Sequence, residues 1–263
     1  MNGANSETVL ITGASSGIGR ELARCFAADG CRLVLVARNT GALEALAAEL
    51  RQAHDVATVV LTADLARPET PERLFNELQS RGITVDVLVN NAGFGAHGAF
   101  AGLPLPRQLE MVQVNLTALM ELTGRFLPGL IQRRRGGVLN VGSVAGFLPG
   151  PGLAVYYATK AFGLSFTEAL AEELTGSGVT VTALCPGPTA TNFGVVARGT
   201  KTRRHQSPSL TAEAVAVHGH RAFRKGRLLA VPGWHNQVLI FLVRILPRRL
   251  VRKLAGRYNR TGD

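Results

Sequence analysis

The stretch TVLITGASSGIG, residues Thr8 to Gly19, decides the fold. It opens with β-branched and apolar residues typical of a buried strand, and the amphipathic segment Arg20 to Ala28 that follows is typical of a helix. In a strand–turn–helix context, glycines at this spacing permit a tight turn, close approach to a pyrophosphate and close helix packing. A plain turn rarely needs three glycines, so the sequence predicts a nucleotide site. Its expected contacts are Gly13, Ser15, Ser16, Gly17, Ile18 and Gly19.

The next expected strand, Arg32 to Ala37, indicates which nucleotide is bound. An acidic residue at its end would hydrogen-bond a ribose 2′-hydroxyl and repel a 2′-phosphate. Ala37 removes that repulsion, and Arg38 can form a charge-assisted pair with the phosphate. The prediction is NADP (NADPH) rather than NAD; the alternative is that Arg38 is a solvated loop residue.

Strand and helix patterns alternate along the following residues. Helices are expected over Gly41 to Ala53, Pro68 to Arg81 and Thr211 to Phe223, the last with Thr211 as its N-cap. Strands are expected over Val56 to Leu61, Val85 to Val89, Val138 to Gly142, Val179 to Leu184 and Leu228 to Val231. This order predicts an α/β fold: a Rossmann-type doubly wound parallel β-sheet of about seven strands flanked by helices. The ligand crevice of such a sheet lies at the carboxyl ends of its strands, where Asp64 and Asn91 fall.

A second stretch, GSVAGFLPGPGLAVYYATK from Gly142 to Lys160, contains candidate catalytic groups. Tyr156 and Lys160 would share one helix face, one turn apart. A phenol has a pKa of about 10, and an adjacent ammonium should lower that pKa towards the working range. Ser143, at the end of a strand, could orient a carbonyl or carbinol oxygen. The three residues predict a carbonyl–alcohol site in need of a hydride source.

Composition limits the alternatives. The chain has 263 residues, of which 46% are hydrophobic, and contains only three cysteines, without CxxC spacing. A disulfide framework and a metal site are not expected, and a cytoplasmic setting fits best. Neither a signal peptide nor a membrane-spanning run is predicted. No acidic or cysteine partners cluster with His218 and His220, and the histidines are expected at the surface.

The positive charge is concentrated near the C-terminus. Residues 198–263 contain 15 Lys and Arg and 2 acidic residues, a net charge of +13, whereas the first 197 residues have a net charge of −2. The basicity therefore belongs to the terminal segment rather than to the catalytic body. Aromatic interleaving is sparse, so no nucleic-acid partner is expected.

Several motifs taken together resemble the short-chain dehydrogenase/reductase family, in an NADP-preferring form similar to bacterial reductases of unassigned specificity. They span Thr8 to Thr191 and comprise TGxxxGxG at Thr12–Gly19, NNAG at Asn90–Gly93, Asn115, Ser143, YxxxK at Tyr156–Lys160, and Pro186–Gly187. One such motif would be weak evidence, but the ordered set is highly specific.

The resemblance implies a role for each catalytic residue. Ser143 would orient the substrate oxygen, Tyr156 would be the general acid in reduction, and Lys160 would lower its pKa and bind the nicotinamide ribose. Asn115 would interrupt a helix so that a backbone carbonyl holds a water in a proton relay. Tyr157 also lies near Lys160, but the motif spacing selects Tyr156, and Tyr157 is expected to be a wall or packing residue.

The resemblance also implies further cofactor contacts. Asp64 would meet the adenine amine, Asn91 would brace the sheet beside the adenine ribose, and Thr189 and Thr191 would hold the nicotinamide carboxamide. The full set expected beyond the glycine turn is Arg38, Asp64, Leu65, Asn91, Ala92, Gly93, Tyr156, Lys160, Pro186, Gly187, Thr189 and Thr191.

The expected organisation is one catalytic domain over residues 1–233, with a substrate lid at about 192–226, and a basic amphipathic helical extension over 234–263. Residues 234–260 could contact anionic lipid as a peripheral membrane surface at the inner membrane. Alternatively they could cover a hydrophobic mouth or pack on another subunit, which is the favoured interpretation.

The predicted function is an NADP(H)-dependent oxidoreductase that interconverts a carbonyl and a secondary alcohol, acting on a hydrophobic substrate. One alternative is a 3-oxoacyl thioester reductase, for which the basic tail could meet an acidic carrier protein. The other is an NADP-binding redox sensor without catalysis. The family resemblance implies a homodimer or homotetramer.

Overall fold

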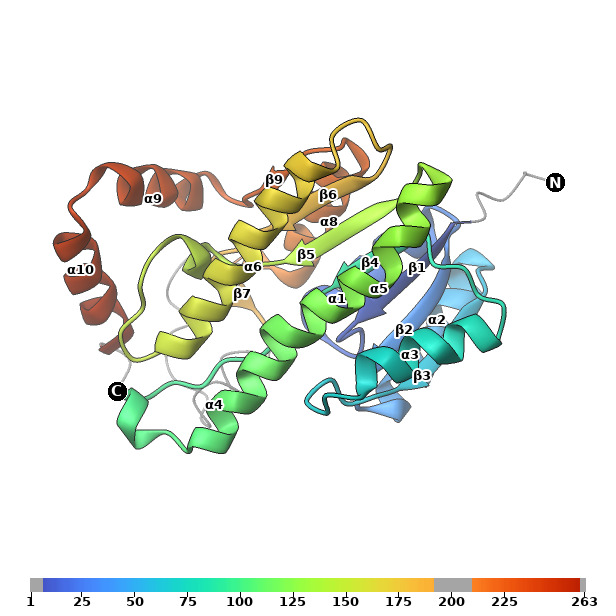
Figure 1. Cartoon of the computed structure of the whole chain (residues 1–263), viewed down its shortest axis with the longest axis horizontal. Helices are drawn as coiled ribbons and strands as arrows, with labels where there is room; N and C mark the ends of the chain where they lie inside the picture. The colour runs from blue at the N-terminus through green and yellow to red at the C-terminus, as the bar shows by residue number, and fades with distance from the viewer. Residues whose placement is uncertain (1–6, 192–209, 261–263) are drawn as a thin grey trace.

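A computed structural model describes residues 7–191 and 210–260 of the chain, which form a parallel sheet covered by helices on both faces (Figure 1). The sheet has seven strands in the order β3-β2-β1-β4-β5-β6-β9, and every neighbouring pair is parallel. The strands are β1 (Thr8–Thr12), β2 (Arg32–Ala37), β3 (Thr58–Thr62), β4 (Val87–Asn90), β5 (Gly137–Val141), β6 (Thr180–Leu184) and β9 (Leu229–Ala230). The predicted Rossmann-type fold is confirmed.

Alternation along β1 explains the two helical layers. Val9 and Ile11 face one side of the sheet and Leu10 faces the other, and all three are fully buried. The side of Val9 and Ile11 packs against α1 (Gly17–Ala28), α2 (Thr40–His54) and α8 (Ala212–Arg224). The opposite side packs against α3 (Thr70–Ser80), α5 (Ala118–Arg133) and α6 (Ala154–Glu173). A sheet buried on both faces needs such apolar strands.

The described part of the expected lid is α8, whose position differs from the prediction. Its N-cap is Thr211, as expected, and Val215 and Phe223 on α8 join the core beside α1. Because α8 fills the layer next to α1, it supports the sheet and does not cover the crevice. Residues 192–209 of the expected lid lie outside the described residues.

The chain ends in two helices, α9 (Trp234–Ile245) and α10 (Arg248–Arg260), at the end of the molecule far from the N-terminus (Figure 1). Ile240 of α9 packs into a small core with Leu164 and Cys185, and Val251 and Ala255 of α10 are buried. Cys185 is buried, as expected of a small apolar residue. Across residues 7–191 and 210–260, no helix has the length and hydropathy that a bilayer-spanning segment requires.

Candidate active site

The glycine turn lies between β1 and α1, at the carboxyl edge of the sheet. Gly13 and Gly17 have positive φ angles, of 66° and 55°. A Cβ atom at Gly13 would lie 2.8 Å from Asn91 Nδ2, so the turn leaves no room for a side chain there. Ser16 is the N-cap of α1 but makes no side-chain capping bond, and the first turn has no acidic residue. The helix therefore presents backbone N–H groups and a positive dipole end.

Thr12 and Asn91 fix the turn to the neighbouring strand. Thr12 Oγ1 accepts hydrogen bonds from the backbone N–H groups of Asn91 and Ala92, each at 3.0 Å, and donates to Val89 O at 3.2 Å. Asn91 Nδ2 donates to Thr12 O at 2.8 Å and to Gly13 O at 3.2 Å. The ends of β1 and β4 therefore form one rigid unit.

Arg38, Asp64 and Leu65 lie along the same edge, away from the catalytic group. Arg38 is exposed directly after β2, the strand next to β1. Asp64 Oδ1 accepts from Ala66 N at 3.1 Å, which leaves its second carboxylate oxygen without a bond among the described residues. Leu65 is buried against the sheet.

Ser143 and Tyr156 form the centre of the site. Ser143 lies just after β5, where its Oγ accepts from Ala145 N at 3.1 Å and donates to Pro186 O at 3.4 Å. A hydrogen bond joins the Ser143 hydroxyl to that of Tyr156. Ser143 is thus held between the tyrosine and the segment after β6.

The protonation of Tyr156 differs from the sequence prediction. Burial raises the pKa of Tyr156 above its ordinary value, and the hydrogen bond with Ser143 only partly opposes this effect. Lys160 lies one turn away on α6, but its Nζ donates to Val141 O at 2.8 Å and lies 6.0 Å from the Tyr156 ring centroid. The expected lowering by Lys160 is therefore wrong for this structure. Burial also lowers the pKa of Lys160 to about 8.

Asn115 lies in a π-helical turn, η2 (Gln113–Thr117), between α4 (Leu105–Val112) and α5. The expected interruption of a helix at Asn115 is present. Its Oδ1 accepts from Phe94 N at 3.0 Å, and its Nδ2 donates to Phe94 O at 2.9 Å and to Thr159 Oγ1 at 3.1 Å. Asn115 therefore joins the loop after β4, including Gly93, to α6.

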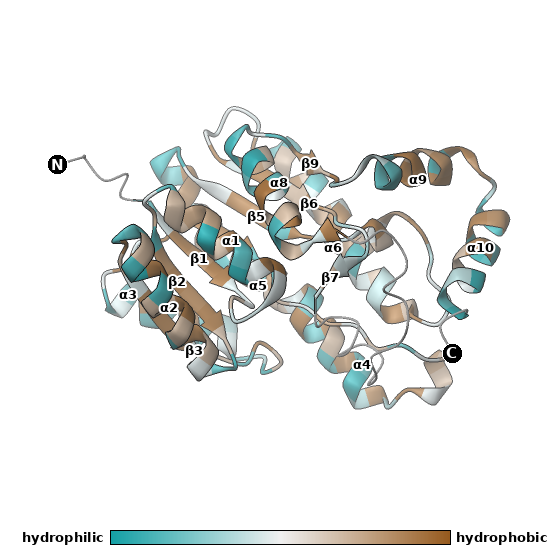
Figure 2. Ribbon diagram, turned by 180° about the vertical axis from the view of Figure 1, so that it is seen from behind, coloured by the Kyte–Doolittle hydropathy of each residue, from teal (hydrophilic) through white to brown (hydrophobic). Residues whose placement is uncertain are grey.

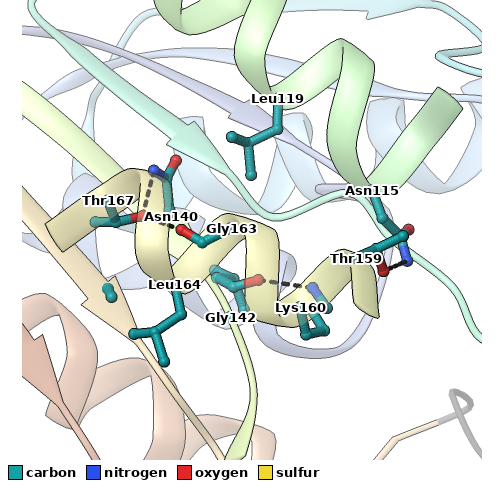
Figure 3. Close-up of a pocket in the computed structure, with 11 residues that line it drawn as sticks. Asn115, Leu119, Asn140, Gly142, Thr159, Lys160, Gly163, Leu164 and Thr167 are labelled. Carbon is teal, nitrogen blue, oxygen red and sulfur yellow. Dashed lines mark hydrogen bonds between the residues drawn. The ribbon is translucent and has the colours of Figure 1, made fainter. Parts of the chain in front are cut away.

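Asn115 and Lys160 line one small internal cavity (Figure 3). Its volume is about 10 Å³, and its wall also includes Asn140, Thr159 and Thr167. A cavity of this size that has polar groups in its wall has room for one water molecule. The structure thus places a single-water space beside the lysine ammonium.

The segment Pro186 to Thr191 closes the crevice opposite the glycine turn. Thr189 lies in β7 (Thr189–Ala190), which pairs with β8 (Leu210–Thr211), and its Oγ1 donates to Gly187 O at 3.0 Å. The Thr191 methyl lies 3.3 Å from the place a Cβ of Gly17 would occupy. The structure thus brings the two predicted cofactor segments into contact.

Two site residues were not predicted from the sequence, His97 and Asn259. Asn259 of α10 donates from Nδ2 to Pro151 O at 2.9 Å, and its Oδ1 lies 3.5 Å from the Tyr157 hydroxyl. The His97 ring Nε2 lies 3.0 Å from Asn259 O. Tyr157, expected as a wall residue, therefore contacts the C-terminal helix, and no local motif marks this long-range contact.

Within residues 7–191 and 210–260, no cluster of three or more His, Cys, Asp or Glu side chains could hold a metal ion.

Known proteins share the sequence and the fold. Residues 7–201 match the family model for short chain dehydrogenases. A very-long-chain 3-oxoacyl-CoA reductase from Laccaria bicolor is 39% identical over 176 residues, which are 65% of this chain and 52% of the relative. The chain thus spans about half the length of that relative.

Two solved structures have the same architecture. A short-chain dehydrogenase from Sphingobium yanoikuyae in complex with NADPH has 34% identity and a TM-score of 0.81, with 92% of this chain and 96% of that chain covered. A short-chain dehydrogenase/reductase from Burkholderia phymatum in complex with NAD has 26% identity and a TM-score of 0.80, with 92% and 94% covered. The family match shows that the chain belongs to the short-chain dehydrogenase/reductase family, and the sheet order agrees with it.

Proposed function

We propose that the chain is an NADP(H)-dependent oxidoreductase that interconverts a carbonyl and a secondary alcohol on a hydrophobic substrate. The observation that carries the proposal is the Ser143–Tyr156 hydroxyl pair, one helical turn from Lys160, at the carboxyl edge of the sheet that also bears the glycine turn. A phenol and a hydroxyl at one point can donate two hydrogen bonds to one carbonyl oxygen.

Each catalytic residue has a task in reduction. Ser143 holds the carbonyl oxygen, and the Tyr156 O–H transfers its proton to that oxygen as negative charge develops. The raised pKa of Tyr156 keeps the phenol protonated and available as an acid. Lys160 and the cavity beside Asn115 form the path by which a proton can return to Tyr156. In oxidation the same groups act in reverse.

The residues at the sheet edge fit a dinucleotide. Gly13 and Gly19 lie so close to Asn91 that neither position has room for a side chain, which keeps the turn tight, and the start of α1 presents N–H groups to a pyrophosphate. NADPH, when bound, supplies a hydride to the carbonyl carbon. Ala37 and the exposed Arg38 at the end of β2 support NADP over NAD. One solved relative is in complex with NADPH and another is in complex with NAD. The proposed preference of this chain for NADP over NAD therefore rests on Arg38.

Apolar side chains around Tyr156 support a hydrophobic substrate. Met111 and Ala96 are buried beside Tyr156, and Phe94, Leu153 and Tyr157 pack against them with part of their surface accessible. Such a lining favours a ketone or acyl chain over a highly charged compound.

A 3-oxoacyl thioester is the second candidate substrate. It is favoured by the likeness to a protein named as a very-long-chain 3-oxoacyl-CoA reductase and by the basic C-terminal helices, which an acidic carrier could meet. A redox sensor without catalysis is the least supported alternative, because a nucleotide-binding module does not need the complete Asn115, Ser143, Tyr156 and Lys160 set.

Oxidation of NADPH with ketones, aldehydes and 3-oxoacyl thioesters tests the proposal. Turnover with at least one carbonyl class is expected, and Tyr156→Phe should lower kcat about a hundredfold or more while cofactor binding persists. Tyr157→Phe is the matched control and should keep kcat within about tenfold of the wild type. Tight NADPH binding without turnover on any class would support the sensor instead.

A homodimer or homotetramer is part of the same proposal. Leu105 and Leu109 of α4, and Met120 and Ile131 of α5, expose large apolar side chains that a second copy could cover. Sedimentation of the purified chain would measure the subunit number.

A further inference from the structure

The helix α9 carries an apolar stripe that no described element covers. Trp234, Val238, Phe241 and Ile245 are spaced by four, three and four residues, which places them on one helical face. Trp234, Phe241 and Ile245 have 76%, 63% and 62% of their surface exposed. The buried residues of α9, Asn236 and Ile240, lie on the opposite face. Figure 2 shows α9 as largely hydrophobic, at the far end of the molecule.

The next helix, α10, also exposes apolar residues and adds charge. Leu250, Leu254 and Tyr258 are exposed at intervals of four residues, while Val251 and Ala255 are buried against the domain. Between Trp234 and Arg260 the chain has no acidic residue. Its basic residues there are Arg244, Arg248, Arg249, Arg252, Lys253, Arg257 and Arg260. Among the described residues, no ion pair involves those from Arg244 to Lys253.

We propose that the exposed stripes of α9 and α10 are a docking surface for an anionic lipid bilayer. Exposed Trp, Phe and Ile side chains beside arginines are the composition of helices that lie in a membrane interface. A surface with seven cations and no anion is complementary to anionic headgroups. The proposal is independent of the reaction assigned to the active site.

Two other occupants fit this surface less well. A second copy of the chain would bring the same cations against each other across a two-fold axis, where they would repel. An acidic carrier protein would satisfy the cations but would leave the indole and phenyl groups of Trp234 and Phe241 without an apolar partner. The bilayer matches both the charge and the apolar stripe.

Helix α10 adjoins the active site. Asn259 of α10 bonds to Pro151 O and lies against Tyr157, the neighbour of Tyr156, while His97 contacts Asn259 O. The buried side of α10 therefore contacts the apolar wall of the crevice, while its exposed stripe faces away from that wall.

Tryptophan fluorescence gives a direct test, because Trp234 is the single tryptophan of the chain. The full-length protein is mixed with phosphatidylcholine vesicles that either contain or lack phosphatidylglycerol. No substrate or cofactor is added, so an inactive enzyme would not affect the readout. With phosphatidylglycerol we expect co-sedimentation and a blue shift of the emission, both weakened by salt.

Matched variants identify the surface. Arg249→Glu/Arg252→Glu/Lys253→Glu should lower the partition coefficient about a hundredfold, since each basic residue near an anionic surface contributes about fivefold. Arg221→Glu/Lys225→Glu/Arg227→Glu changes the same charge on and just after α8 and should bind within about threefold of the wild type on the same basis. Circular dichroism checks that both variants fold.

Phe241→Ser/Ile245→Ser tests the apolar stripe of α9 separately from the charges. It should reduce binding to the vesicles while it leaves every charge in place. The proposal is overturned if phosphatidylglycerol vesicles neither sediment the protein nor shift its emission, or if both charge variants lose binding equally. It is also overturned if an acidic carrier protein, but no vesicle, binds the wild type. A dimer that Phe241→Ser/Ile245→Ser dissociates, without vesicle binding, would make α9 a self-interface instead.

Discussion

Lys160 and Tyr156 are both buried, and burial shifts their pKa values in opposite directions. The charged form of each group loses hydration, so the pKa of the lysine falls to about 8 and that of the tyrosine rises. Both shifts favour neutral side chains. Tyr156 is therefore protonated and neutral at neutral pH. Lys160 is an ammonium at the same pH, and the burial of that charge has a desolvation cost.

A comparison of the wild type with Lys160→Met should reveal that desolvation cost as a pH dependence of the wild-type stability. An unfolded lysine keeps its ordinary pKa of 10.5, whereas in the folded chain the pKa is about 8. Between these values the unfolded state binds more protons, so the free energy of unfolding of the wild type should rise with pH, by up to about 3 kcal/mol. Lys160→Met lacks this rise.

Urea unfolding of both proteins between pH 7 and pH 10.5 measures the difference, and other alkaline effects cancel in it. A wild-type curve that stays parallel to that of Lys160→Met would show that Lys160 is hydrated in the folded state.

Arg38→Ala tests cofactor choice at a single position. Loss of a charge-assisted hydrogen bond to a 2′-phosphate should weaken NADPH binding by about 1.5–3 kcal/mol, which is about tenfold to a hundredfold. NADH binding should change little, because NADH lacks that phosphate. Arg32→Ala, at the opposite end of β2, is the control. Calorimetric titration of both cofactors measures the effect; equal losses for NADPH and NADH would contradict the role of Arg38.

Among the elements, α10 is joined to the domain by apolar packing and by one buried polar residue. Val251 and Ala255 are buried, and Asn259 is 1% exposed. The three contacts of Asn259, two through its side-chain amide and one through its backbone oxygen, reach the segments around His97, Pro151 and Tyr157, more than a hundred residues away in sequence. Polar pairing therefore contributes to the position of the terminal helix.

Asn259→Ala should release α10. The variant leaves Pro151 O without its donor and should cost about 1–3 kcal/mol of local stability. Hydrogen exchange at α10 amides should speed up, while exchange in the central strands stays unchanged. Leu254→Ala, exposed on the same helix, serves as control. If Asn259→Ala and Leu254→Ala exchange alike, the amide contacts do not hold the helix.

At the scale of the whole molecule, one polar cluster joins Glu7, the first described residue, to helix α8. Arg224 of α8 pairs with Glu7 at 2.6 Å and with Asp29 at 2.8 Å, and its NH2 lies 3.2 Å from Cys31 Sγ. His220 lies 2.9 Å from Asp29, so the expectation of a surface histidine without acidic partners is wrong. Burial raises the pKa of Cys31 to about 11, and the thiol stays protonated.

Arg224→Ala should destabilise the folded chain by about 2 kcal/mol, since it removes the ion pairs of two partly buried carboxylates and leaves Asp29 with His220 as its remaining partner. Arg221→Ala, one turn earlier on the exposed face, should change stability by less than about 0.5 kcal/mol. Thermal unfolding at low and high salt compares them, and a similar small effect for both would mean that the cluster is fully hydrated.

Local patterns predicted the parts of the molecule that depend on neighbouring residues. The glycine turn, the N-cap at Thr211 and the apolar strands follow from sequence spacing, so the sheet and its crevice could be predicted. The expected strand over Val56 to Leu61 is observed at Thr58–Thr62, a shift of the kind that pairing with β2 decides.

The remaining features depend on contacts between distant residues. The direction of the Tyr156 pKa shift needs the burial of the ring, and the role of Asn259 needs the fold that brings α10 to Pro151. The placement of α8 beside α1, rather than over the crevice, likewise follows from core packing that the lid expectation did not include.

The π-helical turn at Gln113–Thr117 gives the helix from α4 to α5 one residue more than an uninterrupted α-helix would have. Deleting one residue from this turn would restore regular hydrogen bonding and leave the two halves of the helix facing as they do now, because the wide turn holds the one extra residue. Met111 and Leu122 would then stay buried, whereas Asn115 would lose its place between Phe94 and Thr159. A single-residue deletion here should therefore spare the packing of the helix and remove the placement of Asn115.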